Sequence, residues 1–320
     1  MNPPDSGRTV LHVSPHPDDE SIGAPCTLVA LRDAGWRVIN LAVSLGRPEQ
    51  AERRRAELDA ALGVAGLEGR TMPVPARISR GDDLGRAEQA ITGWLEETVA
   101  ETDADLVIGP HPEDGHHGHE VVGRAIRASL RTVSAERLAA DRPVPVWWMW
   151  SIWRELSEPT LVVGCTDEQL EVAEKMLRAH EGENLRNDYL AMHRPQRRVN
   201  AVRGAELVFG FGTEGLPVES AELLTEVAWA GYGWLRGPAR IHGDSDESDR
   251  EWEPFRLTAP EWTPGAKPDG WGAGHHRRPF LGSRAPWSGQ PRPVNAWPTG
   301  LDLHRPLRST ARRLLGGGPS

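Results

Sequence analysis

Two stretches rich in histidine and carboxylate stand out in the 320-residue sequence, and the first is LHVSPHPDDESIG at residues 11–23. It places His16, Asp18 and Asp19 directly after a short apolar run. An imidazole and a carboxylate three residues apart, at His16 and Asp19, suit a borderline metal ion such as zinc. Asp18 would then point elsewhere and stay free to act on a water. The alternative is a turn in which an aspartate caps a helix, and this stretch alone favours neither.

The second stretch, IGPHPEDGHHGHEVVG at residues 108–123, also joins an apolar run to a helical pattern. It brings together four histidines and two neighbouring carboxylates: His111, His116, His117 and His119 with Glu113 and Asp114. The spacing of His116 and His119 allows one imidazole to bind a metal while the other lies beside it. A histidine-rich surface loop is the alternative, but two such stretches in one chain favour a metal site.

The elements that must position these loops alternate between strand and helix patterns. Strands are predicted at 9–15, 36–44, 70–75, 104–110, 145–153 and 160–166, with a final strand at 205–211. Helices are predicted at 20–35, 48–66, 84–102, 119–140 and about 167–180. This alternation predicts an α/β fold with a mostly parallel sheet and helices on both faces. Ligands bind outside the carboxyl ends of such strands, so both loops are expected on the same rim. No G-x-G-x-x-G is present to support nucleotide binding.

Composition excludes several classes of protein. The net charge of -9, without a Lys/Arg-rich block, argues against a nucleic-acid surface. Two cysteines, Cys26 and Cys165, cannot form a disulfide framework, and Cys26 is expected to be a buried small side chain. The first residues do not resemble a signal peptide, and no apolar run approaches the ~20 residues of a membrane span. We therefore expect a cytoplasmic protein, with its oligomeric state open.

The character of the chain changes near Gly237. We predict a catalytic domain at 1–237 and an irregular extension at 238–320 that is rich in Trp, Pro and Gly. The extension has five tryptophans but too little regular pattern for a core of its own. It is therefore expected to pack on the catalytic domain, with some residues walling the pocket near the His16 and His119 loops.

The motifs PHPDDE and GHHGHE resemble those of the PIG-L or LmbE-like de-N-acetylases, and the resemblance runs over roughly residues 8–212. Three segments support it: ERRRAELDAALGV (52–64), KMLRAHEGEN (175–184) and GAELVFGFG (204–212). The resemblance implies a Rossmann-like α/β sheet, in agreement with the pattern of elements.

The resemblance also implies roles for individual residues. His16, Asp19 and His119 would bind the metal, Asp18 would be the general base, and His116 would act as acid or oxyanion stabiliser. Zn²⁺ is the implied cofactor, with another divalent metal such as Fe²⁺ as the alternative.

Other positions carry weaker implications. The helix at 52–64 would bring Arg54 or Arg55 to the substrate. This chain reads His-His-Gly-His where the family usually has His-Pro-Asp-His, so Gly118 stands in the place of an orienting aspartate. Asp114 or Glu113 would have to replace it.

The implied activity is that of a zinc-dependent hydrolase that removes the N-acetyl group from an N-acetylglucosamine-type amino sugar or glycoside, by attack of a zinc-activated water. Two alternatives stay open: an amidase for larger N-acyl or thiol-conjugate amides, and a non-catalytic binding or scaffold protein that uses the Trp-rich extension. Four further tryptophans are expected to pack in the core and at its rim, although one of them could stack on a sugar: Trp147, Trp148, Trp150 and Trp153. His180 is expected to be structural.

Overall fold

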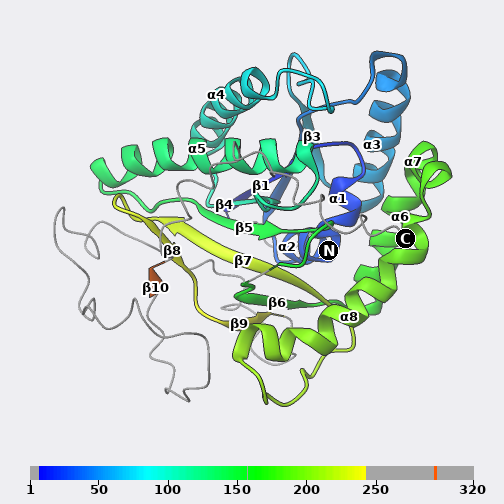
Figure 1. Cartoon of the computed structure of the whole chain (residues 1–320), viewed down its shortest axis with the longest axis vertical. Coiled ribbons are helices and arrows are strands. Elements are labelled where there is room, and N and C mark those ends of the chain that lie inside the picture. Colours follow the sequence, from blue (N-terminus) through cyan, green and yellow to red (C-terminus); the bar gives the residue numbers. More distant parts are fainter. Residues whose placement is uncertain (1–6, 157, 243–291, 294–320) are drawn as a thin grey trace, which may run out of the picture.

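A computed structural model describes residues 7–156, 158–242, 292 and 293 (Figure 1). Five strands form the parallel part of its sheet in the order β3-β2-β1-β4-β5. Their bounds are β1 (Thr9–Ser14), β2 (Arg37–Ala42), β3 (Glu68–Thr71), β4 (Leu106–Pro110) and β5 (Val146–Trp150). The order reverses at β1 and β4, and such a switch point is where open α/β sheets place their ligands.

Beyond β5 the sheet continues mostly with antiparallel pairs. β7 (Ala221–Trp229) runs antiparallel to β5, and β8 (Trp234–Arg236) and β6 (Leu161–Gly164) both pair with β7. β9 (Arg240–His242) lies parallel to β6, and β10 (Arg292–Pro293) lies antiparallel to β8. The sheet is therefore mixed, although its parallel part is the longer run.

Helices cover both faces of this sheet. The bounds are α1 (Asp19–Ile22), α2 (Pro25–Asp33), α3 (Ala51–Ala65), α4 (Leu84–Thr102), α5 (His117–Ala139), α6 (Asp167–Ala179), α7 (Glu181–Arg186) and α8 (Tyr189–Phe209). A 3-10 turn at Pro48–Gln50 leads into α3. Figure 1 shows α4 and α5 together on one face, while α2, α3 and α6 lie on the other.

Strand β1 illustrates how two cores arise from one sequence. Val10 packs into the apolar cluster under α2 and α3, whereas Leu11 and Val13 pack into the cluster under α4 and α5. Because both faces of the strand are buried, it reads as a continuous apolar run. Each buried Val or Leu side chain contributes about 1.5–3 kcal/mol to the stability of the fold. This burial fixes the position of the strand, and with it the loop that follows.

The predicted α/β class, with a mostly parallel sheet and helices on both faces, is confirmed, but two elements differ. The predicted helix 20–35 is interrupted at Gly23 and Ala24, which gives α1 and α2. The predicted strand 205–211 is wrong, because its first residues form the end of α8.

The burial pattern of α8 explains this error. Its inward side chains recur every fourth residue and are Tyr189, His193, Arg197, Ala201 and Ala205. Two of them are polar, so the apolar period that normally identifies a helix is absent from the sequence.

The beginning of the extension belongs to the sheet through β9, and residues 292 and 293 pair with β8. The remaining residues of the extension, and with them the predicted walling of the pocket by its tryptophans, lie outside the described residues. Among the helices that the structure describes, none is long and apolar enough to cross a membrane.

Candidate active site

The loop after β1 forms a closed turn around Asp19. The backbone N–H of His16 donates to Asp19 Oδ2 at 2.8 Å, and His16 Nδ1 lies 3.2 Å from the same oxygen. The other oxygen, Oδ1, lies 3.2 Å from Nε2 of His119, which comes from the loop after β4. One carboxylate thus joins the histidines of both sequence motifs.

Asp18 precedes Asp19 with a strained backbone. Its backbone φ of 128° is a value that residues other than glycine rarely adopt. Its N–H donates to Glu20 Oε2 at 3.1 Å. Although Asp18 is the residue before α1, its carboxylate makes no capping hydrogen bond. The turn therefore does not use this carboxylate as a cap, and it is only 5 % exposed.

The loop after β4 holds His119 by means of Asp114. Asp114 Oδ1 lies 2.8 Å from His119 Nδ1, and its Oδ2 accepts the N–H groups of Ile152 and Trp153 at 2.6 and 3.2 Å. A carboxylate behind an imidazole fixes the ring and leaves the opposite nitrogen for a ligand. Asp114 thus stands where an orienting aspartate is needed, and the Asp19-facing Nε2 of His119 is the nitrogen left for the site.

Gly118 lies where two imidazole rings leave no room for a side chain. A Cβ at this position would lie 2.9 Å from His16 Cε1 and 3.3 Å from His116 Cε1. Any side chain here, including aspartate, would push on two imidazoles. The departure from the family pattern therefore makes room for the cluster, while Asp114 supplies the carboxylate from the preceding turn.

The three imidazoles converge on one point. Ligand nitrogens of His16, His116 and His119 lie within 4.8 Å of one another. The ring centroids of His116 and His119 are 4.7 Å apart. By mutual distance these three histidines form the metal-capable set, with Asp19 against two of them. The donor set of imidazole nitrogen and carboxylate oxygen suits zinc and related divalent ions.

Neighbouring charges and burial shift the pKa values of several side chains in the site. Burial acts against charge on His119, but Asp19 and Asp114 outweigh it and raise its pKa to about 10. Burial and the neighbouring Asp19 raise the pKa of Asp18. Burial and the other histidines lower the pKa of His116 to about 4. The carboxylates thus favour a positive charge between Asp19 and His119, which is the property that a cation site requires.

The two arginines of the 52–64 segment point to different places. Arg54 is buried, and its Nη2 donates to the carbonyl of Pro17 at 3.0 Å and lies 3.7 Å from Asp18 Oδ1. Arg55 is exposed and donates to Thr71. Only Arg54 is brought to the site.

His180 holds the first loop from behind. Its Nε2 lies 2.6 Å from Glu20 Oε1, and both side chains are fully buried. Glu20 in turn accepts the N–H of Asp18, so the pair supports the strained residue. This agrees with a structural role for His180.

A second group of possible metal donors is already occupied. Cys26, Cys165 and Glu222 bring their donor atoms within 4.8 Å of one another, and Cys26 is buried as expected. However, Glu222 accepts hydrogen bonds from Arg197 and from the N–H groups of Cys26 and Thr27. With both of its oxygens taken, Glu222 is a structural carboxylate.

A pocket of about 300 Å³ lies beside the histidine cluster. Its lining includes Trp153, Tyr189 and His193, and the Trp153 ring lies 6.5 Å from that of His116. Trp153 is 49 % exposed, whereas Trp147, Trp148 and Trp150 are buried. The sequence did not predict this pocket, because α8 forms part of its wall and was not recognised as a helix.

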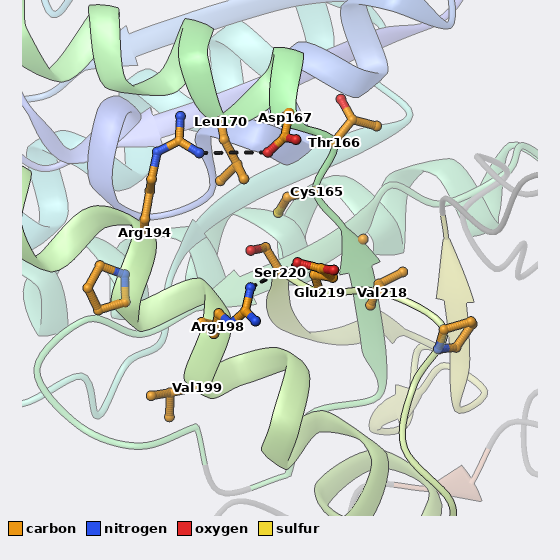
Figure 2. A pocket seen from close by; sticks show the side chains of 13 residues that line it. Cys165, Thr166, Asp167, Leu170, Arg194, Arg198, Val199, Val218, Glu219 and Ser220 are labelled. Carbon is orange, nitrogen blue, oxygen red and sulfur yellow. Dashed lines mark hydrogen bonds and ion pairs between the residues drawn. The ribbon is translucent and has the colours of Figure 1, made fainter.

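A larger hollow of about 780 Å³ lies on another side of α8 (Figure 2). Figure 2 shows Arg194 and Arg198 directed at carboxylates, with Arg198 Nη1 2.9 Å from Glu219 and Arg194 Nη1 3.8 Å from Asp167. The histidines of the cluster line neither hollow, but the smaller one approaches them through Trp153, whose ring lies near that of His116.

Residues 11–130 match the family described as PIG-L, GlcNAc-PI de-N-acetylase. This stretch spans both loops of the site. Over these residues the chain is similar to a family of deacetylases, which are hydrolases that act on C–N bonds, and the resemblance read from the motifs is confirmed there. No curated protein matches the chain significantly.

Solved structures show the same fold at low identity. The N,N'-diacetylchitobiose deacetylase of Pyrococcus horikoshii is 20% identical, with a TM-score of 0.50 over 68% of this chain and 83% of that one. The zinc-inhibited form of teicoplanin deacetylase is 15% identical, with a TM-score of 0.50 over 75% and 99%.

The fold also carries other chemistry. The 4-carboxy-2-hydroxymuconate hydratase of Pseudomonas putida is 17% identical, with a TM-score of 0.52 over 68% of this chain and 95% of that one. The reaction of this chain must therefore be argued from its site and not from its fold.

Proposed function

We propose that the chain is a metal-dependent hydrolase that removes the acetyl group from an N-acetylglucosamine-type amino sugar or glycoside. The observation that carries this proposal is the cluster of three imidazoles from His16, His116 and His119. Asp19 lies against two of them, and Asp18 precedes it in the same loop. They come from the carboxyl ends of β1 and β4, next to a pocket large enough for a small ligand.

His16, Asp19 and His119 are the proposed metal ligands, and zinc is the proposed ion. When bound there, the metal would polarise the acyl carbonyl and lower the pKa of a water to about 7. The description of teicoplanin deacetylase as zinc-inhibited supports an interaction with zinc but makes Fe²⁺ a necessary comparison.

Asp18 is the proposed general base. Its carboxylate is buried, makes no capping hydrogen bond and lies in the loop that also supplies His16 and Asp19. It would take the proton of the attacking water and pass it to the departing amine. Arg54 Nη2, 3.7 Å away, balances the charge of Asp18 and is the proposed contact to substrate; Arg55 is not placed to share that role.

His116 is the proposed oxyanion stabiliser. Its Nδ1 is buried and has no hydrogen-bond partner among the described residues. Burial and the neighbouring histidines lower the pKa of His116 to about 4, so a neutral ring is favoured, and a neutral ring still has one N–H to donate. A donor placed where charge develops contributes about 3–4 kcal/mol to such reactions.

The substrate class rests on the relatives. The family description names GlcNAc-PI, and one structural relative is named for N,N'-diacetylchitobiose. Both names contain an N-acetylated glucosamine.

A cytoplasmic location remains a prediction that cell fractionation would test.

The test is a screen for acetate release from N-acetylated sugars and glycosides, with protein loaded with Zn²⁺ or Fe²⁺. Larger N-acyl and thiol-conjugate amides form a second panel. Acetate release from the first panel supports the proposal, and turnover confined to the second would replace it with an amidase. Turnover of neither, in metal-loaded protein, would oppose both and favour a non-catalytic binding protein.

The matched variant is Asp18→Asn. It should keep the metal but lose about 10²- to 10⁴-fold in kcat, because the water is no longer deprotonated. Near-normal turnover in this variant would move the general base to Glu20, Glu113 or Asp114.

A further inference from the structure

Four buried side chains form a chain of hydrogen bonds behind the first metal loop. His12 and Ser14 come from β1, Asn40 from β2 and Trp150 from the end of β5, and none is more than 1 % exposed. Nδ1 of His12 lies 2.7 Å from Asn40 Oδ1, which also accepts the hydroxyl of Ser14 at 2.8 Å. The Nε1–H of Trp150 donates to His12 Nε2 at 3.2 Å. Without such partners, polar groups at this depth would be costly.

These contacts fix the tautomer of His12. The indole nitrogen of Trp150 can only donate, so His12 Nε2 must accept and the ring proton must lie on Nδ1. Nδ1 then donates to Asn40 Oδ1. Burial lowers the pKa of His12 and outweighs the hydrogen bond to Asn40, so the ring is neutral near neutral pH. His12 is therefore a fixed acceptor for the Trp150 N–H.

The indole of Trp150 in turn lies against the metal site. Its ring meets that of His119 edge to face, with centroids 5.4 Å apart and planes at 89°. A Cβ on Gly23, between α1 and α2, would lie 2.8 Å from two carbon atoms of the indole, so the backbone there packs directly on the ring. The contact of His119 Nδ1 with Asp114 fixes one atom of the imidazole. The tilt of the imidazole about that atom is limited by packing, and Trp150 supplies the packing surface.

We propose that His12 is a positioning residue for the metal centre. By holding the indole of Trp150, it fixes the tilt at which His119 presents Nε2 to the other donors. This inference rests on the proposed function, through the assignment of His119 as a metal ligand. The alternative is a network that stabilises the sheet and has no effect on the metal.

Three variants of the pair separate these roles. His12→Leu has a similar volume but leaves the Trp150 N–H without this acceptor, and Trp150→Phe keeps an aromatic ring but removes the donor. His12→Gln keeps an amide oxygen that can accept the N–H. Competition with a chelator gives the affinity for Zn²⁺. The visible absorption spectrum of Co²⁺-substituted protein reports the coordination geometry.

His12→Leu should bind Zn²⁺ about tenfold more weakly than wild type, as expected when a group that orients a ligand is lost, and its Co²⁺ spectrum should change. His12→Gln should recover most of the loss. In a Trp150→Phe background, His12→Leu should cause no further loss, because the contact through which His12 acts is already gone. A full additional tenfold loss in the double variant would overturn the inference.

The matched control is Trp148→Phe, two residues earlier on the same strand. Trp148 Nε1 donates to the buried Glu226 Oε1 at 2.9 Å, so this variant also loses a buried N–H donor. Its Tm should fall as in His12→Leu, but its Zn²⁺ affinity and Co²⁺ spectrum should equal those of wild type. If His12→Leu likewise lowered only the Tm, the network would be structural and the inference wrong.

NMR tests the hydrogen bond without any metal. In ¹⁵N spectra of the imidazoles of metal-free protein, His12 should show a protonated Nδ1 and an unprotonated Nε2, and its signals are identified by their loss in His12→Leu. The opposite tautomer would exclude the hydrogen bond from Trp150 and overturn the inference.

Metal binding separates this inference from the proposed function. If wild type holds Zn²⁺ and His12→Leu weakens it, but no acetate is released from any sugar, His12 keeps its role and the deacetylase proposal fails. If acetate is released but His12→Leu has the Zn²⁺ affinity and Co²⁺ spectrum of wild type, the positioning inference fails alone. A wild-type protein that takes up no metal would overturn both.

Discussion

Helix α8 contributes to two hollows that differ in chemistry more than in size. The one in Figure 2 is the larger, about 780 against 300 Å³, but the arginines that line it lie beside carboxylates at its rim. The smaller one lies beside the histidine cluster, where Trp153 is exposed and the buried Nδ1 of His116 has no partner among the residues described.

The difference teaches that unsatisfied groups identify a site better than volume does. Exposed ion pairs such as Arg198 with Glu219 are satisfied by each other and by water, and they contribute little. A buried imidazole without a partner is costly, so its presence requires a compensating role. Four variants test whether the chemistry is confined to the side of the smaller hollow.

The largest effect is expected from His16→Ala. It should reduce the metal content from about one ion per chain to near zero, because catalytic zinc sites have only three protein ligands. The loss of activity should exceed the about 100-fold that removal of an outer partner costs. Elemental analysis and acetate release measure both.

The matched control is His117→Ala in the neighbouring turn. His117 is outside the converging set, so this variant should keep its metal. If His16→Ala retained about one metal ion per chain, His16 would not be a ligand and the proposed metal site would be wrong. Metal analysis of His116→Ala and Asp19→Ala would then show which other donors hold the ion.

The next effect is on stability, in His180→Ala. This change leaves Glu20 buried without its partner, which should cost about 3–5 kcal/mol in the free energy of unfolding. Urea unfolding measures the loss. A loss below 1 kcal/mol would show that the support behind the first loop is dispensable.

The pH dependence of this pair has a defined sign. Burial opposes the charge on His180, but Glu20 outweighs it and raises the His180 pKa above 6.5, so its stabilisation is complete below pH 6.5 and is lost as pH rises through the raised pKa. Although burial opposes it, the charge of His180 lowers the pKa of Glu20 below 4.5, so that contribution is complete above pH 4.5 and is lost as pH falls. The difference between wild type and His180→Ala should therefore be greatest between about pH 4.5 and 6.5.

A smaller effect is expected from Asp114→Asn. An amide keeps an oxygen for the N–H groups of Ile152 and Trp153 but no longer carries a charge behind His119. Metal affinity should fall about 10- to 100-fold, with little change in Tm. Competition with a chelator gives the affinity, and an unchanged value would mean that His119 is oriented without Asp114.

The smallest effect is expected from Arg198→Ala in the larger hollow. Its exposed pair with Glu219 should contribute less than about 1 kcal/mol to stability. Metal content and acetate release should equal those of wild type. A tenfold loss of activity would break the comparison and make the larger hollow part of the site.

The parallel part of the sheet was predictable because its signals are local. Helix α4 has the predicted bounds, since Asp83 caps its first turn and its apolar residues follow a helical period. Strands β1 and β4 lie within the predicted ranges 9–15 and 104–110, because their apolar runs end at the two loops. Helix α8 was not predictable in this way, because its buried face includes the polar side chains of His193 and Arg197. Whether such side chains find hydrogen-bond partners depends on the tertiary structure.

The amino-acid sequence by itself determined which residues stand at the carboxyl ends of β1 and β4, and that these residues can bind a metal and move protons. These properties follow from residue type, spacing and strand order, which are local. Only the tertiary structure decided that Arg54 and not Arg55 approaches Asp18, that Asp114 stands behind His119, and that Trp150 contacts both His12 and His119. Each of these depends on a contact between segments brought together by packing, and no spacing along the chain encodes such a distance.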